Sequence, residues 1–253
     1  MFKPLLLLAG VLLSGPTLAA AEVLIVADEF PAMEWLADTL QNREGIPSRV
    51  VAQTNLPPQL AGFRAVIVYI HGNLGARTEQ ALIEYTRAGG KLIVLHHSIS
   101  SGKRNNAQWF KFLGVALPEG DVSQGGYKWI EPVTLDIVKL APDHFITTNQ
   151  VSYPTRIGWR ATGAGTGEES LPGFTLHESE VYLNHVITAP RTQLLGFKYT
   201  DAKSGQVWRQ NHAGWVKPSG GGWIVYLLPG HSVKDFEHPA YARMVLNAVT
   251  WKP

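Results

Sequence analysis

Short apolar runs recur along the first half of the chain. Their residues are mostly Val, Ile, Leu and Ala, with few charges inside a run. They occupy residues 23–26, 49–52, 65–70 and 91–95. Continuous apolar runs, as opposed to alternating ones, are typical of strands that are buried on both faces of a sheet. We therefore expect four strands in this half.

Helical periodicity separates these runs. Trp35 and Leu40 fall on one apolar stripe that ends near Gly45, where a glycine is expected to stop a helix. A second helix is expected to begin with Thr78 as its cap and to end before Gly89. Strands alternating with helices predict right-handed crossovers, so the predicted fold class is α/β with a doubly wound, mostly parallel sheet.

The regular pattern is interrupted between residues 102 and 173, where Gly, Pro and aromatic residues are frequent. A stretch of this length inside a domain is usually a functional insertion or holds short strands of its own. Strand patterns return at residues 193–199, 206–210 and 223–228, and a last helix with one apolar face is expected over residues 239–251. No linker composition divides these parts, so we expect one domain, residues 22–253, with an elaborated middle insertion.

The first 21 residues have the layout of a secretory signal peptide. Lys3 precedes an apolar run over residues 5–13, and three alanines stand directly before Glu22. A transmembrane helix needs roughly 20 apolar residues, and this run is much shorter, so a membrane anchor is the weaker alternative. We expect cleavage after Ala21 and an exported mature protein, periplasmic or secreted, with no stable membrane span.

Composition excludes several classes of function. The chain has 22 Lys+Arg against 20 Asp+Glu, and no basic cluster with interleaved aromatics points to a nucleic-acid partner. The sequence contains no cysteine, which excludes thiol chemistry and disulfides. It also has neither a Walker nor a dinucleotide-binding glycine pattern, so no organic cofactor is expected.

Acids and imidazoles follow the predicted strands at the ends where an open parallel sheet binds its ligands. Asp28 follows the first strand and His71 the third, whereas His96 and His97 follow the fourth and His231 follows the strand over residues 223–228. Because side chains alternate along a strand, only one of His96 and His97 is expected to face the site. For Asp28 and His71, capping or loop hydrogen bonding is the alternative.

Binding of a divalent metal ion is an open alternative for the acids and imidazoles at these strand ends. The nine histidines, with Glu178 and Glu180 among the acids, provide the ligand types that zinc and other divalent ions use. The candidate ligands come from separate segments, and no H-x-x-x-H pair places two of them on one helix face. Spacing alone therefore does not decide for or against a metal.

Several segments together resemble the ThuA-like (trehalose-utilisation) family. They are GGKLIVLHHS, PDHFIT, ESEVY, AGWVKPSGGGWIVYLLPGHS and DFEHPAYARMVLNAVTW. The resemblance spans nearly the whole mature chain and implies a flavodoxin-like fold similar to that of class I glutamine amidotransferases, without the catalytic cysteine. Three features depart from the family pattern: Phe145 stands where a proline is usual, Ser179 replaces an acidic residue, and the first loop, DEFPAM, lacks the histidine that many members carry.

The resemblance also groups candidate site residues. It places His96 at the family's strand-end histidine, Glu180 and Tyr182 in a motif of the D-E-x-Y type, Trp215 at the family's tryptophan and His231 in its glycine–histidine pair. An acid, two imidazoles and two aromatic faces suit a sugar, whose C–H faces stack on rings and whose hydroxyls need fixed polar partners.

These observations predict an exported carbohydrate-active protein that acts on a glycoside or keto-glycoside by general acid/base chemistry. Glu180 is the expected base, and His231 or His96 its acid partner. The residues expected to bind the small carbohydrate are Tyr182, Trp215, His144, Asp28 and His71. The alternatives are a non-catalytic periplasmic sugar-binding or accessory protein, and glycoside hydrolysis by the pair Glu178 and Glu180 on one strand face.

Overall fold

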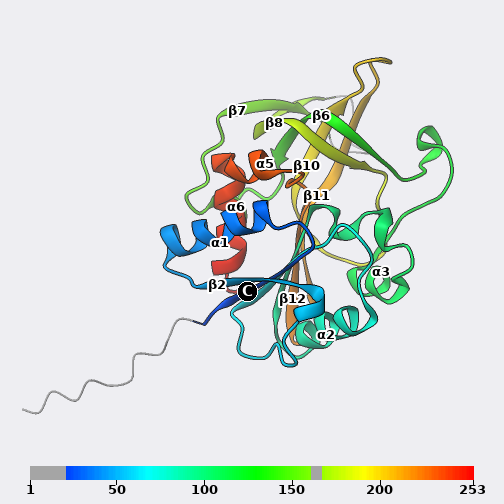
Figure 1. Cartoon of the computed structure of the whole chain (residues 1–253). Coiled ribbons are helices and arrows are strands. Elements are labelled where there is room, and N and C mark those ends of the chain that lie inside the picture. Colours follow the sequence, from blue (N-terminus) through cyan, green and yellow to red (C-terminus); the bar gives the residue numbers. More distant parts are fainter. Residues whose placement is uncertain (1–20, 161–166) are drawn as a thin grey trace, which may run out of the picture.

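One ten-stranded sheet organises the computed structural model, which describes residues 21–160 and 167–253 (Figure 1). Five parallel strands form one half, in the order β2 (Ser48–Ala52), β1 (Val23–Ala27), β3 (Ala65–Tyr69), β4 (Lys91–Leu95) and β12 (Gly222–Leu227). The antiparallel half continues with β11 (Val207–Ser219), β10 (Thr192–Thr200), β6 (Lys128–Lys139), β8 (Glu169–Leu183) and β7 (Thr155–Trp159).

The predicted α/β class is confirmed, but the sheet is not mostly parallel. Every junction from β12 to β7 is antiparallel. Antiparallel strands need no helical crossover, so they produce no alternation of strands and helices in the sequence. The hydrophobic pattern located the strands of the parallel half, which does require crossovers, and in the antiparallel half it located β10 and the beginning of β11.

The helices of the parallel half begin and end for local reasons. Helix α1 (Pro31–Glu44) has a proline in its first turn and ends at Gly45 in the left-handed conformation, at φ 63°. Helix α2 (Ala76–Arg87) begins after Gly75. Thr78 therefore lies inside α2 and is not its cap, contrary to the sequence prediction; its hydroxyl contacts the carbonyl of Gln53.

Helices cover both faces of the parallel half. Helices α1, α5 (Val233–Glu237) and α6 (Pro239–Thr250) contact one another on one face, and α2 and α3 (Ala107–Leu113) contact each other on the other (Figure 1). The smaller elements are α4 (Phe145–Thr148), a two-stranded sheet of β5 (Val115–Ala116) and β9 (Val186–Ile187), and 3₁₀ turns η1 (Gln53–Asn55), η2 (His96–Ile99), η3 (Ser101–Lys103) and η4 (Val122–Gln124).

The middle insertion does hold strands, and one of them, β6, is long. It supplies α3, all of β6 and β7, and the beginning of β8, which pairs with β6 along most of its length. Residues 161–166 of the glycine-rich loop lie outside the described part of the chain. The sequence pattern did not locate β6, because the first half of this strand is largely exposed and its apolar pattern is therefore incomplete.

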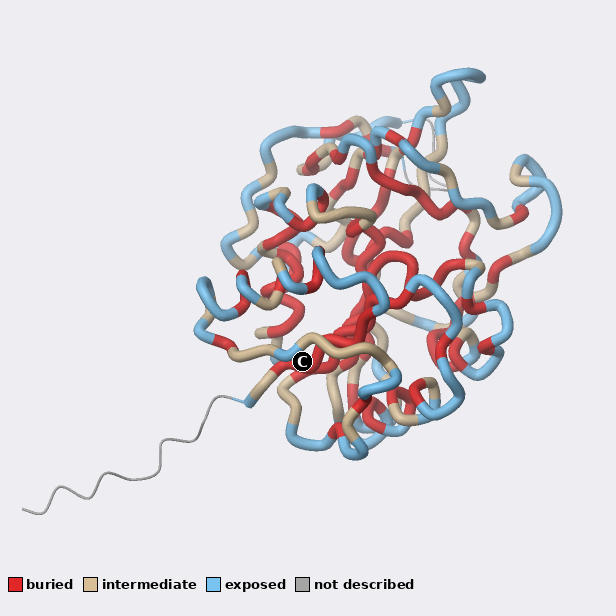
Figure 2. Tube along the Cα trace, in the orientation of Figure 1, coloured by how far each residue is buried: buried red, intermediate tan, exposed pale blue. Residues whose placement is uncertain are grey.

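One apolar core continues beneath both halves of the sheet. Figure 2 shows the buried segments concentrated along the central strands, with exposed loops around them. Trp109 of α3, Phe197 of β10 and Tyr241 of α6 are at most 1% exposed and belong to this same core. The core therefore joins the insertion to the parallel half.

The predicted signal peptide, residues 1–21, lies outside the described residues except for Ala21. Within residues 21–160 and 167–253, no helix is long and apolar enough to cross a membrane.

Two histidines lie side by side in the core of the antiparallel half. His185 and His212 are 6% and 5% exposed, and their ring centroids are 5.3 Å apart. Burial lowers the pKa of both imidazoles, that of His212 to about 4. Both rings are therefore neutral in the folded protein near pH 7.

Replacing His212 by Phe is expected to flatten the fall in stability at acidic pH. The unfolded histidine titrates near 6.5 and the folded one near 4, so its contribution is complete above pH 6.5 and is lost as the pH falls to 4. The loss is on the order of 3 kcal/mol at 1.36 kcal/mol per pKa unit. Urea unfolding at pH 7, 5.5 and 4 measures it. The exposed His177, replaced by Phe, serves as control, and equal slopes in wild type and His212→Phe would contradict the prediction.

Candidate functional site

The backbone turns sharply where β4 ends. His96 follows Leu95 with φ 48°, a left-handed conformation that is uncommon for a residue other than glycine. The side chain is fully buried, and its Nδ1 lies 2.7 Å from the carbonyl oxygen of Leu228. Because a carbonyl only accepts hydrogen bonds, Nδ1 donates, and Nε2 is left facing the neighbouring strand β8.

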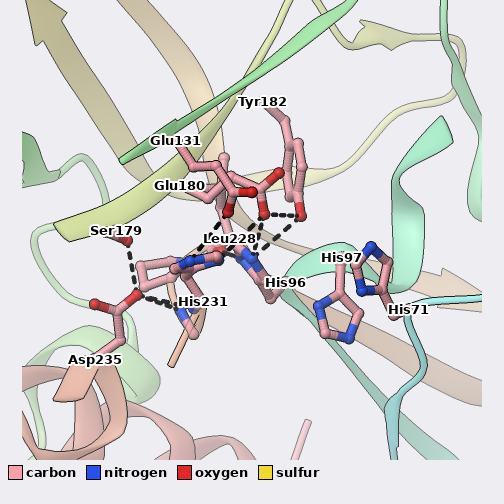
Figure 3. Close-up of polar contacts among 12 residues, drawn as sticks. His71, His96, His97, Glu131, Ser179, Glu180, Tyr182, Leu228, His231 and Asp235 are labelled. Atoms are coloured by element: carbon pink, nitrogen blue, oxygen red, sulfur yellow. Dashed lines mark hydrogen bonds and ion pairs between the residues drawn. The ribbon is translucent and has the colours of Figure 1, made fainter. Parts of the chain in front are cut away.

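Irregular pairing of β8 with β6 brings Glu180 to that nitrogen. The register shifts twice between Ile130 and Leu135, so residues of β8 do not simply alternate between the two faces here. Glu180 Oε2 lies 2.8 Å from His96 Nε2 and accepts a hydrogen bond of 2.7 Å from the hydroxyl of Tyr182 (Figure 3). The structure thus joins an imidazole, a carboxylate and a phenol that sequence analysis had grouped.

Hydrogen bonds keep Glu180 ionised despite its burial. Burial by itself raises the pKa of this carboxyl, but the hydrogen bonds from His231, His96 and Tyr182 outweigh it and lower the pKa to about 2. Burial, reinforced by the charge of Glu180, raises the pKa of Tyr182 well above its usual value. Tyr182 is therefore a protonated donor to a charged acceptor.

His231 stands between two carboxylates at the turn that follows β12. Its Nε2 is 3.1 Å from Glu131 Oε2, and its Nδ1 is 3.5 Å from Glu180 Oε2 (Figure 3). The hydrogen bond to Glu180 raises the pKa of His231, against the opposing effect of partial burial. The shift favours its positively charged form, next to two negative groups.

Asp235 connects the segments that carry Glu180 and His231. Its Oδ2 accepts hydrogen bonds from the Ser179 hydroxyl at 2.7 Å and from the backbone N–H groups of Gly230 and His231 at 3.0 and 2.9 Å. The side chain is 1% exposed. One buried carboxylate thus ties β8 to the turn after β12 and sets how the two site residues lie relative to each other.

A cavity of about 290 Å³ opens beside this cluster. Glu131, Glu180, Tyr182 and His231 form one side of it, and Trp129, half exposed, belongs to the same lining. This volume is near the lower end of the 300–1,000 Å³ range of small-molecule pockets. The cavity is therefore suited to a small ligand.

His71 and His97 line the cavity from the other side (Figure 3). Their rings stack at 5.0 Å, and His71 Nδ1 is 3.1 Å from Glu29 Oε1. Burial, helped by the nearby His96, lowers the pKa of His97 far below its usual range, so this imidazole is neutral. Of His96 and His97, only His97 lines the cavity, whereas His96 is fully buried and contacts Glu180. Strand alternation is not the reason, because the strand ends at Leu95 and both histidines belong to the 3₁₀ turn η2.

Lys103 connects the loop that carries His71 to the turn that carries His97. Its Nζ donates to the backbone carbonyls of Ile70, His71 and His97, the last two at 2.6 and 2.8 Å. The side chain is fully buried, and burial lowers its pKa to about 7. Sequence analysis did not single out this lysine, which stands in an insertion with no regular pattern.

Two predicted binding residues lie away from the cavity lining. Trp215 is 1% exposed, and the guanidinium of Arg191 lies 4.1 Å from its ring centre, so no free ring face is available for a sugar. His144 caps α4 through the backbone N–H of Ile146, and its ring packs 5.1 Å from Trp251. The predicted sugar-binding roles of Trp215 and His144 are therefore wrong. A position within a sequence motif does not determine the direction in which a side chain points.

Two further carboxylates have structural partners. Asp28 accepts hydrogen bonds from the backbone N–H groups of His71 and Gly72, the loop role that had been its alternative. Glu178, at φ 55°, is exposed and pairs with Lys234 at 2.6 Å, whereas Glu180 is buried. The irregular strand therefore separates Glu178 from Glu180, and the expectation that they share a face is wrong.

Sequence analysis missed Trp129, Glu131 and Asp235. The first two stand two residues apart on β6, the spacing that places side chains on one face of a strand, and this was the one signal available. Trp129 pairs directly with Tyr182 across β6 and β8. Only that pairing shows that Trp129 belongs to the site.

Comparisons with known proteins bear on the whole chain. The model of the ThuA family, described as trehalose utilisation, matches residues 22–252. No curated protein matches in sequence. Similar solved structures include a ThuA-like protein from Bacteroides uniformis, with a TM-score of 0.63 and 14% identity over 94% of this chain and 93% of that one.

Two more structures show the breadth of the fold. A ThuA-like protein from Parabacteroides merdae has a TM-score of 0.63 and 10% identity over 92% of this chain and 90% of that one. Agd3, described as a carbohydrate deacetylase, has a TM-score of 0.53 and 12% identity over 90% of this chain but 32% of its own. At such identities the likeness concerns the fold alone.

Proposed function

The chain belongs to the ThuA family, described as trehalose utilisation, and on that premise we propose that it is an exported protein that acts on a small glycoside or keto-glycoside by general acid/base chemistry. The family description indicates a sugar-related role. Export rests on the signal-peptide pattern of residues 1–21.

The observation that carries the proposal is the position of Glu180 at the cavity. Its carboxylate lines the cavity and is contacted on three sides, by His96, Tyr182 and His231. A hydrogen beside a ketone, as in a keto-glycoside, is acidic enough for a carboxylate to remove when the developing negative charge is stabilised. Positively charged His231 is suited to stabilise that charge or to return a proton.

The low pKa of Glu180 sets a condition on this chemistry. A carboxylate with a pKa of about 2 is a weak base while His96, Tyr182 and His231 all contact its Oε2. A sugar oxygen that draws the proton of His231 or Tyr182 toward itself raises the basicity of Glu180 at the same moment. Substrate binding and base activation are thereby coupled.

Trp129 takes the substrate-stacking role that sequence analysis gave to Trp215. It is 50% exposed at the cavity, so its ring can cover the apolar C–H face of a sugar. His71 and Ser101, which are exposed and partly exposed along the same lining, offer polar partners for hydroxyl groups. The cavity therefore combines an apolar face with fixed polar groups, as sugar binding requires.

A thermal-shift screen of residues 22–253 against disaccharides and keto-glycosides tests the proposal. A sugar at 100 times its Kd stabilises the folded protein by about 2.7 kcal/mol, which raises the midpoint by roughly 5–10 °C in a chain of this size. Charged and non-sugar compounds of similar size are the ligand controls. A protein whose midpoint responds to none of the sugars would contradict the proposal.

Trp129→Ala is expected to weaken binding of the sugar found in that screen about tenfold, which corresponds to ~1.4 kcal/mol, because an aromatic face is lost from the cavity. Trp208 of β11 is partly exposed and lies outside the cavity lining, so Trp208→Ala is the matched control. Isothermal titration gives both Kd values. Equal Kd values for wild type and Trp129→Ala would show that the ring does not contact the ligand.

A further inference from the structure

Beyond the proposed sugar chemistry, we propose that His96, Glu180 and His231 form a binding site for one divalent transition-metal ion of the zinc type. The ligand atoms are His96 Nε2, a carboxylate oxygen of Glu180 and His231 Nδ1. The inference rests on the arrangement of these side chains and does not depend on which sugar the cavity takes.

The distances suit such an ion. The three ligand atoms all lie within 4.8 Å of one another, with 2.8 Å from Glu180 Oε2 to His96 Nε2 and 3.5 Å to His231 Nδ1. Ligand atoms bonded at 2.0–2.1 Å to a tetrahedral ion lie about 3.3 Å apart. An increase of about half an ångström in the distance between Glu180 Oε2 and His96 Nε2 would accommodate the ion. Two histidines with one carboxylate, plus a position left open, is the ligand set of catalytic zinc sites.

The outer nitrogen of each imidazole has its own fixed acceptor. His96 Nδ1 donates to the carbonyl of Leu228 at 2.7 Å, and His231 Nε2 faces Glu131 Oε2 at 3.1 Å. Metal-binding histidines commonly donate their second ring N–H to a carbonyl or carboxylate, which orients the ring and makes the binding nitrogen more basic. Both histidines have this outer arrangement, from unrelated segments of the chain.

Counting protons shows that a positive centre lies among these groups. With Nδ1 of His96 donating to Leu228, a neutral ring presents a lone pair at Nε2 to a carboxylate oxygen 2.8 Å away. Two acceptors at this distance repel each other unless a proton or a cation lies between them. The same holds for His231, whose two nitrogens both face carboxylates. One divalent ion satisfies both histidines at once.

The cavity gives the ion access and an open coordination position. His231 and Glu180 have side chains 30% and 11% exposed and both line the cavity, whereas His96 is enclosed behind them (Figure 3). An ion held by the three groups would therefore face the cavity, where a sugar hydroxyl or carbonyl oxygen can complete its coordination. In the loaded form Glu180 is a ligand, and in the unloaded form it is available as a base.

Metal binding is tested on chelator-treated protein comprising residues 22–253. We expect Zn²⁺ to bind at one ion per chain in isothermal titration and metal analysis, and Mg²⁺ to bind much more weakly because it prefers oxygen ligands. His231→Ala and Glu180→Gln are expected to abolish stoichiometric binding. Glu131→Gln, which removes only an outer partner, is expected to weaken binding 10–100-fold. His177→Ala, at an exposed histidine of β8, is the control and should leave the Kd unchanged.

Several outcomes would overturn the inference. One is a wild-type protein that binds no zinc at a stoichiometric level; another is unchanged zinc binding in both His231→Ala and Glu131→Gln, the second of which covers the case that the first misfolds. Sugar-dependent stabilisation of the chelator-treated protein without any zinc binding would overturn the metal site and leave the proposed function standing. Zinc binding without any sugar response would support the metal site and contradict the proposed function.

Discussion

Turnover of the sugar substrate is expected to fall by about 10²–10⁴-fold when Glu180 is replaced by Gln, the usual effect of removing a general base. The amide keeps the shape of the side chain but has no negative charge, so it neither accepts a proton nor stabilises the charged form of His231. Rates with the sugar identified by thermal shift measure the effect. Because the proton transfer is part of the chemical step, we expect the fall in rate chiefly as a lower kcat, with a smaller change in KM.

Glu178→Gln is the matched control for this experiment. Glu178 stands two residues earlier on the same strand, but its side chain is exposed and paired with Lys234. Its replacement should leave turnover within a factor of about two, because Glu178 lies outside the cavity lining, and should change stability by no more than about 0.5 kcal/mol. Full turnover in Glu180→Gln would contradict the catalytic role of Glu180. A wild-type protein that binds the sugar but does not turn it over would favour the non-catalytic sugar-binding alternative.

Lys103→Met is expected to lower the free energy of unfolding by about 3 kcal/mol, because three carbonyl groups, two of them in buried contacts, lose their common donor. Methionine keeps most of the apolar stem, so the change isolates the role of the ammonium group. The midpoint of thermal unfolding should fall by roughly 6–12 °C. Since two of the carbonyls belong to His71 and His97, sugar binding should weaken as well.

Urea unfolding of wild type, Lys103→Met and Lys111→Met separates this effect from loss of a surface charge. Lys111 is an exposed lysine on α3, close to Lys103 in sequence, and its replacement should change stability by no more than about 0.5 kcal/mol. If Lys103→Met proves as stable as Lys111→Met, the carbonyls of Ile70, His71 and His97 have found other donors and the lysine is dispensable.

The parallel half of the fold could be predicted because its signals are local. The runs at β1, β3 and β4 are buried on both faces, and Gly45 stops α1 through its own left-handed conformation. Each of these features depends on a few neighbouring residues and on crossovers that the chain must make between parallel strands. The pairing of β6 with β8 depends on segments about forty residues apart, and no local pattern encodes it.

The same division holds for the candidate site. His96, Glu180, Tyr182 and His231 were grouped from the sequence by motif resemblance, and the structure brings them into contact. For Trp215 the resemblance indicated a binding role, but the direction of its side chain depends on β11 lying between β10 and β12.

By itself, then, the sequence determined the strand and helix alternation of the first half, the absence of thiol chemistry and the polar residues that end the strands. The tertiary structure alone decided which of those residues meet. It buries Trp215 in the core and leaves Trp129 exposed at the cavity. An irregular strand separates Glu178 from Glu180. Two residues that the sequence did not indicate, Glu131 and Lys103, contact the residues of the candidate site. The physical reason is that hydrophobic periodicity reports what each segment buries, whereas contacts between distant segments are set by register and by shared burial.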